Sequence, residues 1–557
     1  MKKNDWALII SLLLYSILFY DQSAGINFLL FSIAVVGLLV YRNTALLKDK
    51  AWLSVAAGVI VSSFFIFMYG SALSIWANLF SLFILSGLSI NPKTSFLTSV
   101  FLTVCAIGSS CVFMFIDWVT RKSKQIAGEY QRPFYVKMFL IVIPFLIAIL
   151  FFFFYQTSNP LFYDFTKDIN LDFISIGWMF FTLGGLLLLY GFYHNTIMPG
   201  VAAADERAAL LLTPEVATRK NFLNGMMRID NENLSGIILF TMLNALLLIL
   251  NLLDLNYFLF DGKLPKGIDH KAFVHDGIGT LITSVIVAIL IILFYFRGEL
   301  NFYQKSKWIR IMAFIWIFQN AFMIFSSAYR NDMYIDESGI SYKKIGVYVY
   351  LLLTLIGLIT TFVKVWKVKT NWYLFKVNAS VYYYILVLSC IPNWDVIITD
   401  FNIKKHDVEN KKLEKYLLLD LSYKNLPQLL SLPDSLAFTE DINARDYYNY
   451  SRGTYYNNFR SGLSKKLYDF MVEYPALEWQ SYCYEKTRVY NDIIAMKDSV
   501  TWLRFESAYI PTLRPLAEFS NLRELVIENN YNFDVSELIT FPKLEKLKLM
   551  NCQIDSL

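Results

Sequence analysis

Long apolar runs separated by short polar segments fill residues 1–392 of this 557-residue chain. Each run has about the ~20 residues that a helix needs to cross the hydrocarbon core of a bilayer. Backbone groups that face lipid must be paired within their own segment, so helix is the expected state of each run. The twelve runs are residues 6–20, 26–41, 52–69, 72–90, 96–119, 138–155, 173–192, 236–255, 278–296, 309–328, 347–365 and 372–391.

Lysine and arginine in the short loops predict the orientation of these helices. The loops after the ninth and eleventh runs are basic, and the positive-inside rule places both in the cytoplasm. The alternating loops, and everything after residue 391, then face outward. Counting back puts the basic residues near the N-terminus on the wrong side, so one early run is expected not to cross. Residues 72–90 are the first choice because Ser74, Asn78 and Ser81 interrupt them, and 11 to 13 spans are predicted.

The pattern changes after residue 402, where charges become frequent and the long apolar runs end. Residues 403–499 are expected to form a helical connector, whereas residues 500–557 carry an internal repeat of 22 positions. Its columns include Val500, Leu522 and Leu544; Leu503, Leu525 and Leu547; Phe505, Ile527 and Leu549; and Ala508, Asn530 and Cys552. This LxxLxLxxN/C pattern is typical of leucine-rich repeats, in which the apolar columns fill a shared core.

The residues between the core columns are expected to line an exposed sheet face that binds another protein. They are Arg504, Glu506, Glu524, Val526, Glu528, Lys546, Lys548 and Met550. A rigid charged surface of this kind recognises its partner by complementarity. Each repeat buries its core only against neighbours, so the first strand is expected to lean on the connector as a cap. The sequence stops at Leu557, which leaves an open edge that is expected to pair with a partner.

Composition supports a membrane protein and excludes several classes of function. Hydrophobic residues make up 56% of the chain, charged residues 17%, and the mean hydropathy is +0.44. The net charge of +5 is spread over many loops and gives no nucleic-acid footprint. Five scattered cysteines without a CxxC spacing predict neither a disulfide framework nor a zinc site, and no cofactor is expected. No GxSxG, Walker or HExxH motif occurs, which removes the recognisable kinds of enzyme and favours a protein without catalysis.

Charged residues in the loops at one end of the central runs form a candidate interfacial cluster. Its members are Asp269, His275, Arg330, Asp332 and Asp336. A metal site would need donors such as His270 and His275 to converge on one ion, but helix positions five apart project about 140° apart. A solvated loop is therefore favoured over metal binding. Structural pairing of Arg330 with acidic neighbours is favoured too, because an unpaired charge near lipid is costly, and a substrate or headgroup contact is the alternative.

Three loops and one later segment carry a resemblance to a known family. Residues 264–277 hold an LPxG turn before an aromatic residue and a glycine, and residues 328–340 a YR…Y loop. Residues 393–402 hold a D…N pair, and residues 413–427 are similar to a YLxxLSxDAVP segment in which Tyr423, Lys424 and Asn425 replace the usual small and acidic residues. In order and spacing the set resembles the bacterial multi-pass membrane family named domain of unknown function 4173, which is related to 4153. The resemblance implies a bacterial membrane protein of a family without a known activity.

These observations predict an all-α polytopic membrane bundle of 11–13 transmembrane helices, followed by a soluble α/β domain that ends in short leucine-rich repeats. The expected domains are N-terminal transmembrane segments (1–120), a family-like transmembrane core (121–402), a helical soluble connector (403–499) and the repeat segment (500–557). The expected function is a scaffold or sensor in the bacterial inner membrane, whose extracytoplasmic repeats bind a protein. The alternative is a transporter or a lipid-modifying membrane enzyme with a site at the interfacial loops.

Overall fold

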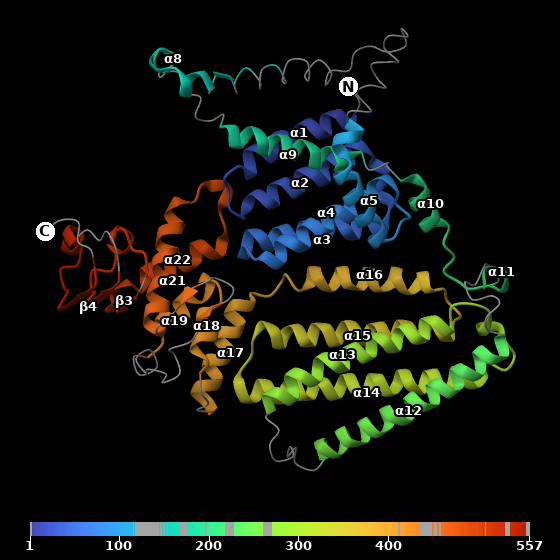
Figure 1. Ribbon diagram of the computed structural model, residues 1–557. Helices are drawn as coiled ribbons and strands as arrows, with labels where there is room; N and C mark the ends of the chain where they lie inside the picture. The colour runs from blue at the N-terminus through green and yellow to red at the C-terminus, as the bar shows by residue number, and fades with distance from the viewer. Residues whose placement is uncertain are drawn as a thin grey trace, which may run out of the picture. The chain divides into compact units, whose positions relative to one another are not determined.

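The computed structural model describes residues 3–114, 116, 144, 148, 151–152, 154–166, 175–194, 198–217, 228–259, 270–409, 413–433, 448–449, 454–455, 458–506, 508–529 and 535–552. The chain divides into two compact units. Figure 1 shows their helices and strands. Unit 1 comprises Met1–Arg207, Tyr383–Ile391 and Leu477–Glu485. Unit 2 comprises Ala208–Tyr382, Pro392–Ala476 and Lys486–Leu557.

Unit 1 consists of helices whose starts are set by capping side chains. Asp49, Ser71, Ser95 and Ser175 each accept a hydrogen bond from a backbone N–H in the first turn of the following helix, which satisfies a donor that the helix leaves unpaired. Its elements are α1 (Lys3–Phe19), α2 (Ile26–Arg42), η1 (Thr44–Lys48), α3 (Lys50–Tyr69), α4 (Ala72–Ile90), α5 (Phe96–Gly108), α8 (Pro160–Thr166), α9 (Ile176–Tyr193), α10 (Pro199–Arg207) and η6 (Trp479–Ser481).

Helix α4 is the run that the sequence singled out as least suited to crossing a membrane. Its polar residues Ser74, Asn78 and Ser81 are all fully buried against other helices. The Asn78 amide donates to the hydroxyls of Ser32 and Ser62, at 3.2 Å each, and to a carbonyl of α3 at 3.0 Å. These residues therefore serve packing between helices. They are no argument against a span, and α4 is long and apolar enough to be one.

The helices of unit 2 begin with a parallel pair. Two hydrogen bonds show that helices α12 and α14 run in the same direction. The amide of Asn244 donates to the Met312 carbonyl at 2.9 Å, and the amide of Asn251, later in α12, donates to the Gln319 carbonyl, later in α14, at 3.2 Å. Helix α13 precedes α14 and helix α15 follows it in the chain, and both pack against α14. The elements are α11 (Pro214–Ala217), α12 (Ile229–Leu259), α13 (His270–Tyr295), η2 (Glu299–Phe302), α14 (Lys307–Ser338), α15 (Tyr342–Trp366) and α16 (Asn371–Leu388), of which α16 extends into unit 1.

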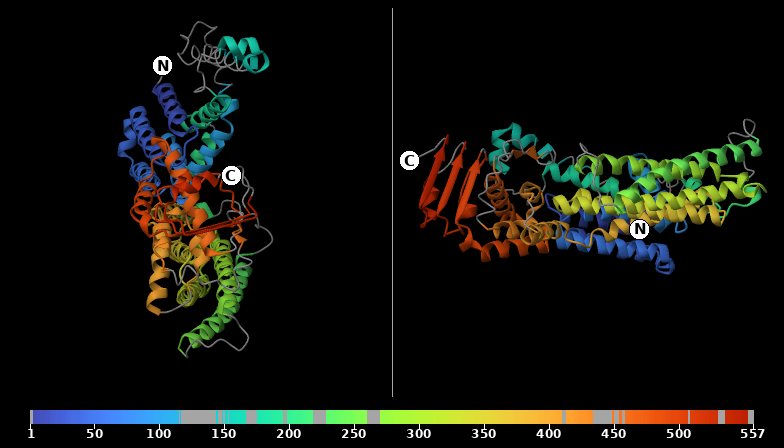
Figure 2. Two further views of the ribbon diagram at one scale, coloured as in Figure 1. Left: turned by 90° about the vertical axis from the view of Figure 1, so that its left-hand side faces the viewer. Right: turned by 90° about the horizontal axis from the view of Figure 1, so that it is seen from below.

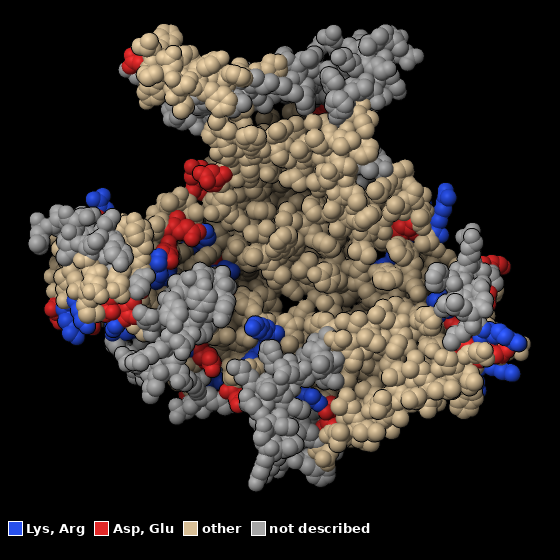
Figure 3. Space-filling model, in the orientation of Figure 1, with Lys and Arg blue, Asp and Glu red and all other residues tan. Residues whose placement is uncertain are grey.

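Six helices among the described residues are long and apolar enough to cross a membrane, which is consistent with a membrane protein. They are α3, α4, α9, residues 229–256 of α12, α14 and α15. Shorter apolar helices cover Asp5–Phe19, Ile26–Arg42, Phe96–Gly108 and Thr283–Tyr295. On the face drawn in Figure 3, charged side chains of unit 2 gather at the two ends of its helices, and the surface between them is mostly uncharged. The described helices thus support part of the predicted 11–13 spans, and the run at residues 138–155 lies largely outside the described residues.

The rest of unit 2 is a mixed region with one hydrophobic core. Helices α17, α21 and α22 and strands β3 and β4 contribute buried side chains to it, and the partly buried Leu549 of β5 packs against it. Its elements are α17 (Trp394–Glu409), α18 (Lys415–Leu419), η3 (Tyr423–Asn425), α19 (Leu426–Leu430), β1 (Tyr448–Asn449), β2 (Thr454–Tyr455), α21 (Phe459–Glu473), η5 (Tyr474–Ala476), α22 (Tyr484–Ala495), η7 (Lys497–Ser499), β3 (Trp502–Glu506), η8 (Arg514–Leu516), β4 (Glu524–Glu528), η9 (Val535–Thr540) and β5 (Lys546–Met550).

Strands β3, β4 and β5 form a parallel sheet, seen as three neighbouring arrows in Figure 2. Leu503 pairs with Leu525 and Leu525 with Leu547, so the strands are in the register that the 22-residue alignment predicts. Asn529 and Asn551, which follow β4 and β5, both adopt a positive φ, at 54° and 51°. Asparagine is among the few residues that tolerate this conformation. Each strand therefore ends at the same repeat position.

Helix α21 covers the β3 edge of this sheet. The backbone N–H groups of Arg504 and Glu506 donate to the hydroxyls of Ser464 and Ser461 on α21, each at 3.0 Å. These bonds occupy donors that an edge strand would otherwise expose. The cap that the sequence placed in residues 403–499 is thus found in α21.

Candidate functional site: a polar junction and the repeat sheet

The members of the candidate interfacial cluster lie apart from one another where their side chains are described. Asp269 lies outside the described residues, and His275 lies in α13, with its side chain outside them. Arg330 of α14 is buried and forms an ion pair with the buried Asp254 of α12. Ser326, one turn before Arg330, donates to the other Asp254 oxygen at 2.5 Å. The partner of Arg330 thus comes from a different helix and is none of the acidic neighbours that the sequence suggested.

Asp332 and Asp336 have partners of their own. Asp332 accepts a hydrogen bond from the Tyr348 hydroxyl at 3.3 Å. Asp336 forms an ion pair with the Lys405 ammonium, 2.8 Å away. A small cavity beside Glu337 and Lys405 has a volume of about 10 Å³. That is no larger than the space for one water molecule. Arg330, Asp332 and Asp336 therefore join three separate contacts at the ends of the helices.

The turn between α14 and α15 is held by a side chain of α17. The Asn402 amide group accepts from the Ile340 N–H at 2.8 Å and donates to the Ile340 carbonyl at 2.9 Å. Gly339, the residue before Ile340, has a φ of +72°, and a Cβ atom on Gly339 would lie 2.1 Å from the Asn402 side-chain oxygen. Only glycine satisfies both the backbone conformation and the close approach. Asn402 thus holds this turn in place through both the oxygen and the nitrogen of its amide.

Asp395, at the start of α17, joins the same helices to the segment around η3. Its carboxylate is 3% exposed and accepts from the Tyr342 hydroxyl of α15 at 2.8 Å, from Ser422 at 2.5 Å and from the Lys424 ammonium at 3.1 Å. Burial by itself raises the pKa of Asp395. The Lys424 charge and the three hydrogen bonds outweigh burial, so the pKa lies below its ordinary value. Asp395 is therefore ionised at physiological pH and binds Tyr342, Ser422 and Lys424 at once.

We call these contacts of α17 with the helix ends and with η3 the junction. Its main residues, Asp395, Asn402, Lys405 and Lys424, were not among the candidate site residues from the sequence. A signal for two of them existed, because Asp395 and Asn402 are the D…N pair of the third loop. Lys424 is one of the departures from the family pattern in residues 413–427, and Lys405 carried no signal. Nothing in the spacing of either lysine indicates which carboxylate it meets. The junction binds the mixed region of unit 2 to the ends of α14 and α15.

The expected protein-binding face of the repeat sheet is only partly open. Arg504 forms ion pairs with Glu506 of its own strand and with Glu528 of β4, and the Glu506 and Val526 side chains are buried. Glu524 lies 3.9 Å from Lys546, measured between the charged groups. The β3 and β4 part of this face is therefore largely occupied by its own neighbours.

Strand β5 is the open part. Lys546 and Lys548 are exposed, and Met550 is half-buried. On the other face Leu547 is 44% exposed, whereas its repeat equivalents Leu503 and Leu525 are 2% and 0% exposed. Because the sheet continues on only one side of β5 within the described residues, this strand presents two lysines and an apolar side chain together.

The comparisons with known proteins identify a family without assigning an activity. The family model described as "Domain of unknown function (DUF4153)" matches residues 7–432. Comparison with curated proteins and with solved structures found no match. The match covers the apolar runs, the junction loops and the segment through η3 and α19. The chain therefore belongs to the DUF4153 family.

Proposed function

We propose that this protein is a membrane-anchored scaffold or sensor whose C-terminal sheet binds another protein. The observation that carries the proposal is strand β5, which is the outer strand of the parallel sheet within the described residues and exposes Lys546, Leu547 and Lys548. An edge strand can add a strand of a partner by main-chain hydrogen bonds, and its side chains then select the partner. The two lysines favour an acidic segment.

The finer identities belong to the same proposal. The 22-residue register and the buried apolar columns support leucine-rich repeats as the type of the sheet. The resemblance of the loops supports the 4173 group and a bacterial inner membrane, and the basic loops at the opposite helix ends support an extracytoplasmic side for the sheet. The junction supports a scaffold role, because it holds the sheet-bearing region against the helix ends by buried polar contacts.

The rival function, a transporter or a lipid-modifying enzyme, would use the interfacial cluster as its site. The described members of that cluster are occupied by Asp254, Tyr348 and Lys405, in three different contacts. This arrangement favours a structural role for them.

Photocrosslinking in intact cells tests the proposal. A photoreactive residue at position 548 is expected to give a discrete adduct with the partner. A photoreactive residue at position 547 should give one as well, and this second adduct is expected to disappear when Lys546→Glu and Lys548→Glu reverse the charges beside it. A crosslinker at the exposed Glu518, in the connection between β3 and β4, serves as the control. Equal adducts from positions 518 and 548, or no adduct from the β5 positions, would contradict the proposal.

A further inference from the structure

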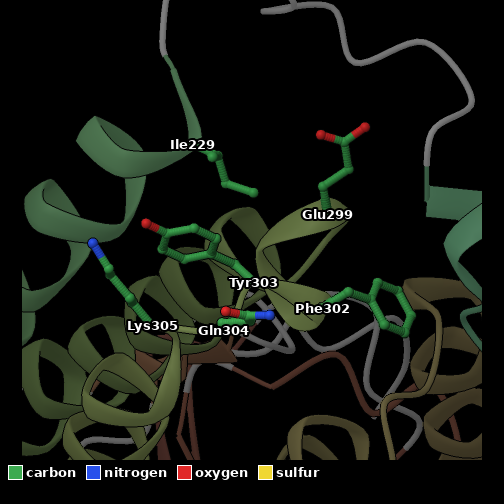
Figure 4. Close-up of a pocket in the computed structure, with 6 residues that line it drawn as sticks. All are labelled: Ile229, Glu299, Phe302, Tyr303, Gln304 and Lys305. Atoms are coloured by element: carbon green, nitrogen blue, oxygen red, sulfur yellow. The ribbon is translucent and has the colours of Figure 1, made fainter.

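A surface hollow of about 370 Å³ lies at the end of the unit 2 helices that is opposite to the junction. It is formed where α12 begins and where η2 leads into α14 (Figure 4). Its lining residues are Ile229, Glu299, Phe302, Tyr303, Gln304 and Lys305. All of them belong to unit 2.

The lining combines apolar walls with a cationic group. Ile229 and Phe302 supply hydrocarbon, and Phe302 is 41% exposed. In Figure 4 the Lys305 ammonium and the Tyr303 hydroxyl point to the same side of the hollow, whereas the Glu299 carboxylate points to the other side. The Tyr303 hydroxyl donates to Asp230, so the donors left for a ligand are the Lys305 ammonium and the Gln304 amide. The hollow therefore has one side suited to an anion.

The charges around the hollow leave an excess of cations. Of the lining residues Glu299 and Lys305 are charged, and the charged residues near them in the chain are Arg228, Arg297, Lys307 and Arg310 against Asp230 and Glu232. Arg297 pairs with Glu232 at 3.1 Å, and Arg228 lies 3.8 Å from Asp230. Lys305 and Lys307 are both exposed, and within the described part of the chain neither has a carboxylate partner. These two ammonium groups are thus available to a ligand.

The position of the hollow indicates where the ligand comes from. The first residue of α12, Ile229, lines the hollow, and α14 begins two residues after the lining residue Lys305. Both helices are long and apolar enough to span a membrane. Trp308, next to Lys307, is 62% exposed, and exposed aromatic residues at the end of a span are typical of the level of lipid headgroups. Basic side chains at this level attract anionic lipids.

We propose that this hollow binds the phosphate of an anionic phospholipid. Lys305 contacts the phosphate, the exposed Lys307 nearby adds to the positive charge, and the first acyl carbons lie against Ile229 and Phe302. A free phosphate would share the lysine contacts and would leave the apolar walls unused, so the lipid is the better fit. This inference is independent of the proposed function of the sheet.

Thermal unfolding of the full chain in a neutral detergent tests the inference. Phosphatidylglycerol is expected to raise Tm, whereas phosphatidylcholine with the same acyl chains and inorganic phosphate are not. Each lysine near a charged lipid surface contributes enough to change affinity roughly 5-fold, so the variant Lys305→Gln with Lys307→Gln should lose roughly 30-fold in apparent affinity.

Two variants control the experiment. Lys343→Gln removes an exposed lysine at the junction end of the same helices and should keep the response to phosphatidylglycerol. Lys305→Arg keeps the charge and should also retain it. An equal response to phosphatidylcholine, a response to inorganic phosphate alone, or unchanged lipid affinity in the double variant would each overturn the inference, and so would an equal loss in Lys343→Gln.

Discussion

Replacement of Asp395 by asparagine is expected to weaken the junction strongly. The change keeps the size of the side chain but removes the charge. It also leaves an acceptor oxygen for only one of the two hydroxyls, because Tyr342 and Ser422 donate to different oxygens of Asp395. The Lys424 side chain, which is 7% exposed, then has no counter-ion in the junction. Loss of one partner of a buried ion pair costs about 3–5 kcal/mol.

A double-mutant cycle separates the pair from its surroundings. Lys424→Met alone leaves a buried carboxylate with its two hydroxyl donors, and we expect it to cost about 2–3 kcal/mol. The combination Asp395→Asn with Lys424→Met removes both charges and should cost less than the sum of the single changes, by roughly 3 kcal/mol. Asp400→Asn, at an exposed position of the same helix, is the control and should change stability by less than about 0.5 kcal/mol.

The same contact predicts a dependence on pH. The folded pKa of Asp395 lies below its ordinary value, whereas the unfolded carboxyl titrates near ~3.9. The stability from Asp395 is therefore complete above about pH 5 and declines as the pH falls toward the folded pKa, because the unfolded state then binds the proton more readily. The stability difference between the wild type and Asp395→Asn should shrink over this acidic range.

Pulse proteolysis of the full chain in detergent, over a urea series, measures these differences. The surviving full-length band reports the fraction of molecules in which the region from α17 to β5 is folded. A shift of less than about 1 kcal/mol for Asp395→Asn, or simple additivity in the cycle, would refute the argument that Asp395 and Lys424 form a buried pair.

Three further predictions concern backbone and core. Gly339→Ala should destabilise the junction by about 1–3 kcal/mol in the same assay, because the φ of this residue is +72° and the new Cβ would meet the Asn402 side chain. Gly346→Ala in α15, where the new Cβ would have open space around it, should be neutral or slightly stabilising. Asn529→Ala should cost about 1 kcal/mol and Asn529→Gly less, since only the former resists a φ of 54°; equal costs would contradict this. Leu525→Ala should cost about 2–5 kcal/mol and Leu547→Ala clearly less, because the first side chain is 0% and the second 44% exposed, and reversed costs by urea unfolding would place the core elsewhere.

The repeat sheet shows how far periodicity carries a prediction. The columns of Leu503, Leu525 and Leu547 are spaced by 22 residues, and the strands pair in that register. The alternation within each strand also predicts which side chains point to the core. Periodicity did not reveal that Val526 and Glu506 are buried on the opposite face. Glu506, for example, is held by Arg504 of its own strand and by Asn458 outside the repeat, and the repeat pattern indicates neither contact.

The junction shows where such reasoning ends. The sequence indicated that Arg330 needs a partner near lipid, and the partner is Asp254 of another helix. The acidic residues nearest to Arg330 in the chain lie on the same helix, and Asp336 points instead to Lys405. Proximity along the chain was therefore a poor guide to the candidate site.

The sequence by itself determined the apolar helices and the strand register, since both follow from spacing over a few residues or one repeat. Only the tertiary structure decided the ion pairs Arg330 with Asp254, Lys405 with Asp336 and Lys424 with Asp395, whose members are 76, 69 and 29 residues apart. A charged side chain shows in the sequence that it will need an opposite charge when it is buried. Which one it meets depends on how the helices pack, and that is set by the whole set of buried contacts.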